Sequence, residues 1–302
     1  MSPNSRLLNL SQRLCKNQIT ILQKQRDPAS APLMKYSISL DMILPDVPFE
    51  KRVGVVAKEG FQYIEFWGWK NRDIDALQRE LKSNSVGVAL FAGHRKSSTI
   101  DSRYHERFLK EIRESIDLAH KLDCQNIDVY SDELLEGKTD VTPKIYPARA
   151  SSLPYKKKFA NLLKAMEKGA DLAEKEDVVL QLEALNLFDH PRYFLSKSET
   201  TLEVIRKVNN PHLKMLYDIY HMQISEGNIT NTLLENLDNV GHIHVADVPG
   251  RHEPGTGELN YDFILGQLHE ARFKGTVGFE YLAEKNDKSA LQSIHQLASR
   301  WS

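Results

Sequence analysis

The sequence of 302 residues lacks several features that mark particular classes of protein. It has only two cysteines, Cys15 and Cys124, which form no framework for disulfides or a structural zinc site. No apolar run approaches the roughly 20 residues that a membrane-spanning helix requires. The formal net charge is −1, so neither a nucleic acid nor an anionic membrane is indicated as a partner. Two thiols and no secretory signal lead us to expect a cytoplasmic protein.

Glycine-rich phosphate-binding loops are also absent. The first apolar segment runs into SLDMILPDVPF, Ser39–Phe49, which contains no glycine at all. A doubly wound nucleotide-binding sheet usually has a glycine-rich turn after its first strand, and no Walker pattern occurs elsewhere. No internal repeat is visible beyond an alternation of apolar and amphipathic segments. These absences argue against a nucleotide-binding fold.

The alternating segments predict eight strands, each followed by a helix. The predicted strands are Tyr36–Leu40, Tyr63–Trp67, Val86–Phe91, Asn126–Tyr130, Val178–Glu183, Leu213–Asp218, Gly241–Ala246 and Thr276–Glu280. The predicted helices are Phe49–Glu59, Asp73–Ser83, Tyr104–Lys121, Tyr155–Glu176, Ser198–Val208, Asn231–Leu237, Tyr261–Ala271 and Lys288–Trp301. Eight such units in about 270 residues predict an α/β fold of the (β/α)8 TIM-barrel type.

The first 33 residues differ from the remainder. They are basic, carry leucines at roughly helical spacing and have no acidic residue before Asp27, and RDPASAP at 26–32 is typical of a linker. We therefore predict a helix-prone N-terminal extension over 1–33 and a barrel over 34–302. The extension is an accessory helix or reflects a start codon upstream of Met34. Its basic, serine-containing composition also suits a transit peptide.

Four consecutive predicted strands, the fifth to the eighth, end with a side chain that can bind a metal. These side chains are Glu183, Asp218, His244 and Glu280. Active sites of such barrels lie at the carboxyl ends of the strands, so the four are expected to converge. Three carboxylates and one imidazole suit Mn²⁺ or Mg²⁺, with Co²⁺ as a further candidate. The sequence therefore predicts one divalent metal ion as cofactor.

Glu183 and Glu280 are the outer members of this cluster, and each can also face a substrate. A carbonyl beside a hydroxyl-bearing carbon can lose a proton to form an enediolate, which a metal ion stabilises. One glutamate would take the proton, and the other would return a proton to a neighbouring carbon or to the opposite face. This chemistry describes aldose–ketose isomerisation or epimerisation of a small hydroxy-carbonyl substrate.

Several further residues are candidates for substrate binding. His221 follows Asp218 by three residues and can donate to a substrate oxyanion, or bond to backbone at a helix start. Arg251 can hold an oxygen or a carboxylate, although a solvated loop arginine is an equal alternative. Asn186 and Asp189 lie shortly after Glu183 and can contact substrate hydroxyl groups.

Aromatic residues and a histidine also follow the earlier strands. Trp67 ends the second predicted strand and can form an apolar wall over the substrate, although buried aromatics more often serve in packing. His94 follows the third strand and faces the pocket or makes local hydrogen bonds. The long connection Ser131–Pro154 after the fourth strand is typical of a lid or an interface element.

The sequence resembles the hydroxypyruvate isomerases, which belong to the xylose isomerase-like TIM-barrel superfamily. The most specific segment is GHIHVADVPGRHEPGTGELNY, Gly241–Tyr261, and QLEALN and LYDIYHMQISEGNIT agree with it. The similarity covers roughly Lys35–Leu282. It implies that Glu183 and Glu280 form the acid/base pair and that both bind metal together with Asp218 and His244. It also implies that His221 and Arg251 contact the substrate.

One departure concerns His244. Many hydroxypyruvate isomerases have a glutamine at this position, and the histidine is similar to the pattern of ketose 3-epimerases. The leading hypothesis is an isomerase that interconverts hydroxypyruvate and tartronate semialdehyde, and the alternative is a ketose 3-epimerase. An apurinic endonuclease would need more histidines and a basic surface, and a non-catalytic sugar sensor would not need both glutamates. The sequence is also compatible with a homo-oligomer.

Overall fold

A computed structural model of the chain describes residues 34–134 and 151–301. The predicted extension over residues 1–33 lies outside the described residues, as do residues 135–150 of the predicted long connection. The boundary at Met34 therefore stays a prediction.

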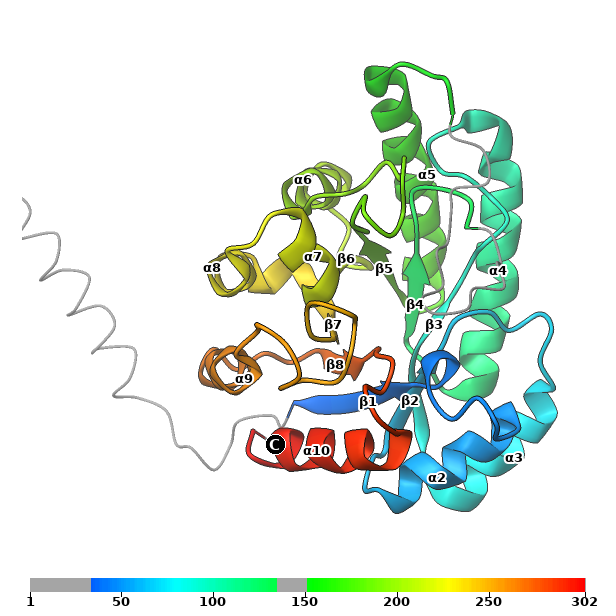
Figure 1. Cartoon of the computed structure of the whole chain (residues 1–302). Coiled ribbons are helices and arrows are strands. Elements are labelled where there is room, and N and C mark those ends of the chain that lie inside the picture. Colours follow the sequence, from blue (N-terminus) through cyan, green and yellow to red (C-terminus); the bar gives the residue numbers. More distant parts are fainter. Residues whose placement is uncertain (1–33, 135–150, 302) are drawn as a thin grey trace, which may run out of the picture. The chain divides into compact units, whose positions relative to one another are not determined.

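Eight parallel strands close into a barrel in the order of the chain, with the last strand paired to the first. This arrangement confirms the predicted (β/α)8 fold (Figure 1). The strands are β1 Lys35–Ser39, β2 Tyr63–Phe66, β3 Gly87–Ala92, β4 Asn126–Val129, β5 Val179–Glu183, β6 Leu213–Asp218, β7 Val240–Val245 and β8 Thr276–Phe279.

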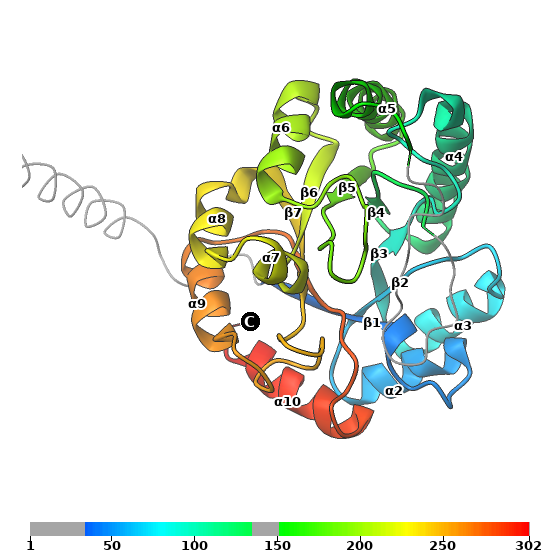
Figure 2. The same cartoon turned by 45° about the horizontal axis from the view of Figure 1, so that its top comes forward.

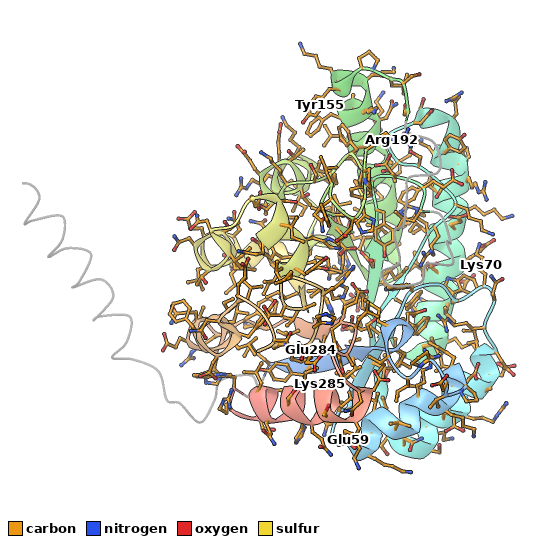
Figure 3. The ribbon with its side chains drawn as sticks, in the orientation of Figure 1. Glu59, Lys70, Tyr155, Arg192, Glu284 and Lys285 are labelled. Carbon is orange, nitrogen blue, oxygen red and sulfur yellow. The ribbon has the colours of Figure 1, made fainter. Side chains whose placement is uncertain are left out.

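Helices surround the strands, as the two views in Figures 1 and 2 show. They are α2 Arg52–Lys58, α3 Ile74–Asn84, α4 His105–Leu122, α5 Tyr155–Lys175, α6 Ser198–Val208, α7 Ile219–Ser225, α8 Ile229–Glu235, α9 Tyr261–Glu270 and α10 Asp287–Ser299. Exposed side chains such as Lys70, Tyr155 and Lys285 point away from the barrel (Figure 3). Within 34–134 and 151–301, every helix is too short or too polar to cross a lipid bilayer.

Local signals in the sequence explain where the helices begin and end. Asp73 caps α3 because its side chain accepts a hydrogen bond from the Ala76 amide at 2.8 Å. The 18-residue helix α4 buries one face, which includes Phe108 and Ile112, and ends at Asp123 in the left-handed conformation. This amphipathic pattern is the one from which the helix was predicted.

Helix α7 was not predicted. Asp218 ends β6 and caps this helix, accepting a hydrogen bond from the His221 amide at 3.2 Å. The first four residues of the helix, Ile219–Met222, are all buried. The segment therefore has no alternation of apolar and polar residues from which a helix could be predicted. The predicted helix Asn231–Leu237 is α8, which begins and ends two residues earlier.

Apolar side chains pack between the strands and the helices, and the inside of the barrel contains buried polar side chains, among them Ser37, Glu65 and His242. Phe66 and Phe91 stack with ring centroids 5.4 Å apart. Nearby, Glu65 of β2 is buried inside the barrel and accepts a hydrogen bond from Ser37 of β1. Gly278 of β8 leaves room for this carboxylate, because a Cβ atom at that position would overlap its oxygens.

Candidate active site

The ends of β5 to β8 bring the four predicted metal ligands together. Glu183 and Asp218 end their strands, His244 lies in β7, Glu280 directly follows β8, and all four are buried. His244 Nδ1 lies 3.9 Å from Glu183 Oε1 and 3.6 Å from Glu280 Oε2. Ligand atoms of Asp218, His244 and Glu280 lie within 4.8 Å of one another, as do those of Glu183, Asp218 and His221. Asp218 therefore joins two overlapping groups of potential ligands.

Unpaired polar atoms show that this cluster fits a cation. Glu183 Oε1 and His244 Nδ1 are buried and have no hydrogen-bond partner among the described residues. The other ring nitrogen of His244, Nε2, lies 2.9 Å from Glu65 Oε2. Because the ionised Glu65 can only accept, Nε2 carries a proton and Nδ1 faces the carboxylates. Burial lowers the pKa of His244, but Glu280 and Glu65 outweigh burial and raise it well above its usual range, so a metal ion at Nδ1 would displace a proton. A divalent ion would satisfy these atoms and offset the repulsion among the acids.

Glu65 is the residue that orients His244. It is buried in the barrel, and its Oε1 also lies 2.8 Å from His242 Nε2. Burial alone raises the pKa of this carboxyl, but His242 and His244 outweigh burial and lower it strongly. A carboxylate that holds the outer nitrogen of a metal-binding histidine is a common support for metal sites.

The two glutamates have different surroundings. Burial, followed by the neighbouring Asp128 carboxyl, raises the pKa of Glu183 well above its usual range. Burial also acts on Glu280, but Arg251 and His244 outweigh it and lower the pKa of Glu280. Arg251 pairs with Glu280 and lies 3.3 Å from Asp218 Oδ2. The two glutamates thus differ in proton affinity in the protein alone, which is the kind of difference that an acid/base pair uses.

His221 is held by Asn186 and Asp189. The Asp189 amide donates to Asn186 Oδ1 at 2.8 Å, so the Asn186 Nδ2 group faces His221 Nδ1 at 2.7 Å. His221 Nδ1 therefore accepts a hydrogen bond, and the proton lies on Nε2. That nitrogen is 3.4 Å from Asp218 Oδ2. Asn186 and Asp189 thus lie behind His221, and their predicted direct contact with a substrate stays a prediction.

His94 lies in a similar internal network. Its Nε2 accepts a hydrogen bond from the Tyr130 amide at 2.9 Å, and its Nδ1 is 3.1 Å from Ser97 Oγ. Burial lowers the pKa of His94 to about 4, so the ring is neutral at physiological pH. Both ring nitrogens thus have hydrogen-bond partners within the protein. This is the second of the two roles that the sequence allowed for His94, local hydrogen bonding. Its predicted contact with a substrate stays a prediction.

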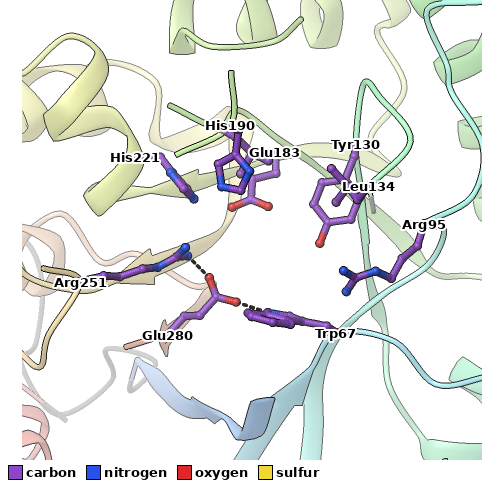
Figure 4. Close-up of a pocket in the computed structure, with 10 residues that line it drawn as sticks. Trp67, Arg95, Tyr130, Leu134, Glu183, His190, His221, Arg251 and Glu280 are labelled. Carbon is purple, nitrogen blue, oxygen red and sulfur yellow. Dashed lines mark hydrogen bonds and ion pairs between the residues drawn. The ribbon is translucent and has the colours of Figure 1, made fainter. Parts of the chain in front are cut away.

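A pocket opens above the cluster and includes about 340 Å³ of space, part of which is continuous with solvent. Arg251 and His221 lie on the left of this space in Figure 4, Glu183 lies at its top, and Glu280 lies at its bottom beside Trp67, which donates to it. The lining residues are Trp67, Arg95, Tyr130, Leu134, Glu183, Leu185, His190, His221, Arg251 and Glu280. The polar and charged side chains among these residues suit a small polar molecule.

Sequence reasoning missed several residues of this site. Asp128 of β4 lies near Glu183, and burial raises its pKa to about 8. Arg95 and Tyr130 line the pocket opposite Arg251 (Figure 4). Asp128 and Tyr130 belong to the fourth predicted strand, so their position near a strand end was a signal that they could reach the site. Arg95 directly follows His94 and had the same signal.

Comparison with known proteins identifies the family. The family model described as "Xylose isomerase-like TIM barrel" matches residues 53–300. The chain belongs to the xylose isomerase-like TIM-barrel family. It is 33% identical over 268 residues to the hydroxypyruvate isomerase of Escherichia coli K12, which covers 86% of this chain and 98% of that protein. It is 30% identical over 255 residues to the 2-oxo-tetronate isomerase of Haemophilus influenzae, covering 82% and 93%. These family members confirm the predicted enzyme class, an isomerase similar to hydroxypyruvate isomerases.

Solved structures share the barrel. The structure titled "AP endonuclease, family 2" from Brucella melitensis is 26% identical, has a TM-score of 0.77, and covers 87% of this chain and 99% of its own. A D-allulose 3-epimerase from Methylomonas sp., solved with D-allulose, is 19% identical with a TM-score of 0.68, covering 89% and 95%. The latter likeness shows the fold alone.

Proposed function

We propose that this isomerase interconverts hydroxypyruvate and tartronate semialdehyde, or acts on a closely related small hydroxy-carbonyl acid, through an enediolate. The observation that carries the proposal is the pair of buried glutamates, Glu183 and Glu280, on either side of His244 in one small pocket. The names of the curated relatives, which are isomerases of hydroxypyruvate and 2-oxo-tetronate, support the same substrate class.

The proposed cofactor is one divalent ion, Mn²⁺ or Mg²⁺, with Co²⁺ as a further candidate. Glu183, Asp218, His244 and Glu280 would hold it, since three carboxylates and one imidazole form a donor set that these ions accept. When bound, the ion supplies a positive charge that stabilises the negative oxygen of the enediolate.

The side chains of the pocket account for the proton transfers. One glutamate removes a proton from the hydroxymethyl carbon, and the electron pair forms the carbon–carbon double bond of the enediolate. The other glutamate delivers a proton to the former carbonyl carbon. A proton also moves from the hydroxyl oxygen of the substrate to the former carbonyl oxygen. His221 is placed to take part in this transfer, because its protonated Nε2 lies on the side of Asp218. Arg251 keeps Glu280 ionised and in place.

Incorporation of solvent deuterium tests this proposal. The protein is incubated in deuterium oxide with Mn²⁺ and, separately, hydroxypyruvate, 2-oxo-tetronate and small neutral ketoses, and the substrate carbon is followed by NMR. We expect deuterium in hydroxypyruvate together with its aldehyde product, or in 2-oxo-tetronate together with its 3-oxo isomer. If no compound of the panel exchanges with saturating Mn²⁺ or Mg²⁺, the proposal is wrong.

A ketose 3-epimerase is the second candidate, and His244 favours it because ketose 3-epimerases resemble this sequence there. The same two glutamates would then remove a proton from one face of the carbon and return one to the other face. The same experiment separates the candidates, because an epimerase gives a stereoisomer with the carbonyl in its original place, whereas an isomerase moves the carbonyl to the neighbouring carbon.

An apurinic endonuclease is less suitable, although the Brucella structure carries that title. The net charge of −1 and the acid-rich donor set offer little attraction to a phosphate backbone. We therefore propose a cytoplasmic enzyme whose partner is a small molecule and not a nucleic acid or a membrane, and a homo-oligomer is compatible with this role.

A further inference from the structure

Two arginines line the pocket, and they differ in their partners. Arg251 pairs with Glu280, lies 3.3 Å from Asp218 Oδ2 and is buried. Arg95 lies on the opposite side of the pocket (Figure 4) and forms no ion pair with any carboxylate of residues 34–134 and 151–301. Its Nε atom is buried and has no hydrogen-bond partner in the same part of the chain. Arg95 is thus a positively charged side chain at the pocket that has no carboxylate paired with it among the described residues.

The position of Arg95 is fixed by its neighbours. Its backbone carbonyl accepts a hydrogen bond from the Leu134 amide at 2.9 Å. Its guanidinium lies over the Trp67 ring, with 5.8 Å between the guanidinium carbon and the ring centroid. Trp67 in turn donates to Glu280. The guanidinium is therefore held in a defined position relative to a candidate acid/base residue, on the far side of the space that a substrate would fill.

No carboxylate among the described residues pairs directly with Arg95, although the charge of Arg95 acts on Asp41 at longer range. The neighbouring polar side chain in the pocket is Tyr130, and burial raises the pKa of its hydroxyl well above the usual range, so it is neutral. Asp41, the next carboxylate, is paired with Arg72 and accepts from the Trp67 amide at 2.7 Å. A partly buried guanidinium of this kind is best satisfied by a planar anion that accepts two hydrogen bonds.

We propose that Arg95 binds the carboxylate of the substrate, so that the pocket selects hydroxy-carbonyl acids over neutral ketoses. The inference rests on the proposed function and narrows its substrate class. With the carboxylate at Arg95, the adjacent carbonyl and hydroxyl-bearing carbons extend toward Glu183 and Glu280, where the proton transfers occur (Figure 4). A neutral sugar places a hydroxyl group beside Arg95 and leaves the guanidinium without an anion.

Two three-carbon ketones provide the test. Hydroxypyruvate and dihydroxyacetone differ only in whether a carboxylate or a hydroxymethyl group flanks the carbonyl. Arg95→Gln, Arg95→Lys and the unaltered protein are assayed by deuterium exchange with both compounds. We expect Arg95→Gln to lower the ratio of kcat/KM for hydroxypyruvate over dihydroxyacetone by about 10- to 100-fold, mainly through KM. Arg95→Lys should recover part of the ratio, because it restores the charge but not the paired donors.

The control is Arg113→Gln, which removes an exposed arginine of α4 and should leave the ratio unchanged. If Arg95→Gln changes both compounds equally or neither, the inference is wrong. Calorimetric binding of pyruvate separates this failure from failure of the isomerase proposal, because binding requires no turnover. Pyruvate should bind the unaltered protein at least 10-fold more tightly than Arg95→Gln. Equal or absent binding would overturn the role of Arg95 even if the protein were active.

Discussion

Replacement of Glu65 by glutamine should weaken metal binding, although Glu65 is not itself a proposed metal ligand. Glu65 Oε2 accepts the hydrogen bond of His244 Nε2 at 2.9 Å in the buried interior of the barrel. A buried hydrogen bond to a charged group contributes about 1.5–3 kcal/mol, and support of this kind changes metal affinity by about 10- to 100-fold. Glutamine keeps the shape of the side chain but loses the charge that makes His244 a stronger ligand.

The assay for Glu65→Gln is calorimetric titration of the metal-free protein with Mn²⁺. The variant should bind Mn²⁺ with a dissociation constant about 10- to 100-fold higher. Thermal unfolding of the metal-free protein serves as a check that the barrel remains folded. Glu235→Gln is the matched control, since Glu235 is exposed at the end of α8, remote from the barrel interior. Unchanged Mn²⁺ affinity in a folded Glu65→Gln protein would refute the role assigned to Glu65.

Two other predictions concern metal binding and His221. Because the metal-free protein raises the pKa of Glu183, the ion must displace a proton, so Mn²⁺ affinity should fall as pH is lowered, by up to about tenfold per unit. An Mn²⁺ affinity that stays constant between about pH 5 and 8 would contradict the predicted displacement of a proton. Asn186→Ala removes the donor to His221 Nδ1, and we expect turnover to fall about tenfold with Mn²⁺ affinity unchanged. Parallel losses of turnover and affinity would mean that Asn186 supports the metal instead.

The sequence predicted the parts of this site that depend on strand ends. Glu183, Asp218, His244 and Glu280 occupy equivalent places in successive βα units, so closure of the barrel alone brings them together. Their separation along the chain carried enough information for that prediction.

The supporting contacts could not be predicted in this way. Glu65 meets His244 across the interior of the barrel, from strands that are not neighbours, and the contact depends on the space left at Gly278. Helix α7 has no amphipathic pattern, because its first turn is buried on every side. The direction in which the side chain of a loop residue such as Arg95 points depends on how the loop packs. A single sequence does not specify that packing.

The central claim is that Glu183 and Glu280 both transfer protons. Glu183→Gln and Glu280→Gln, each loaded with saturating Mn²⁺ and shown to be folded, are assayed for turnover and for exchange of the substrate proton with deuterium oxide. Both should lose about 10²–10⁴-fold in turnover. The variant that lacks the base should also lose exchange, whereas the variant that lacks the reprotonating group should still exchange the proton without forming product. Near-native turnover in both variants would contradict the two-glutamate mechanism.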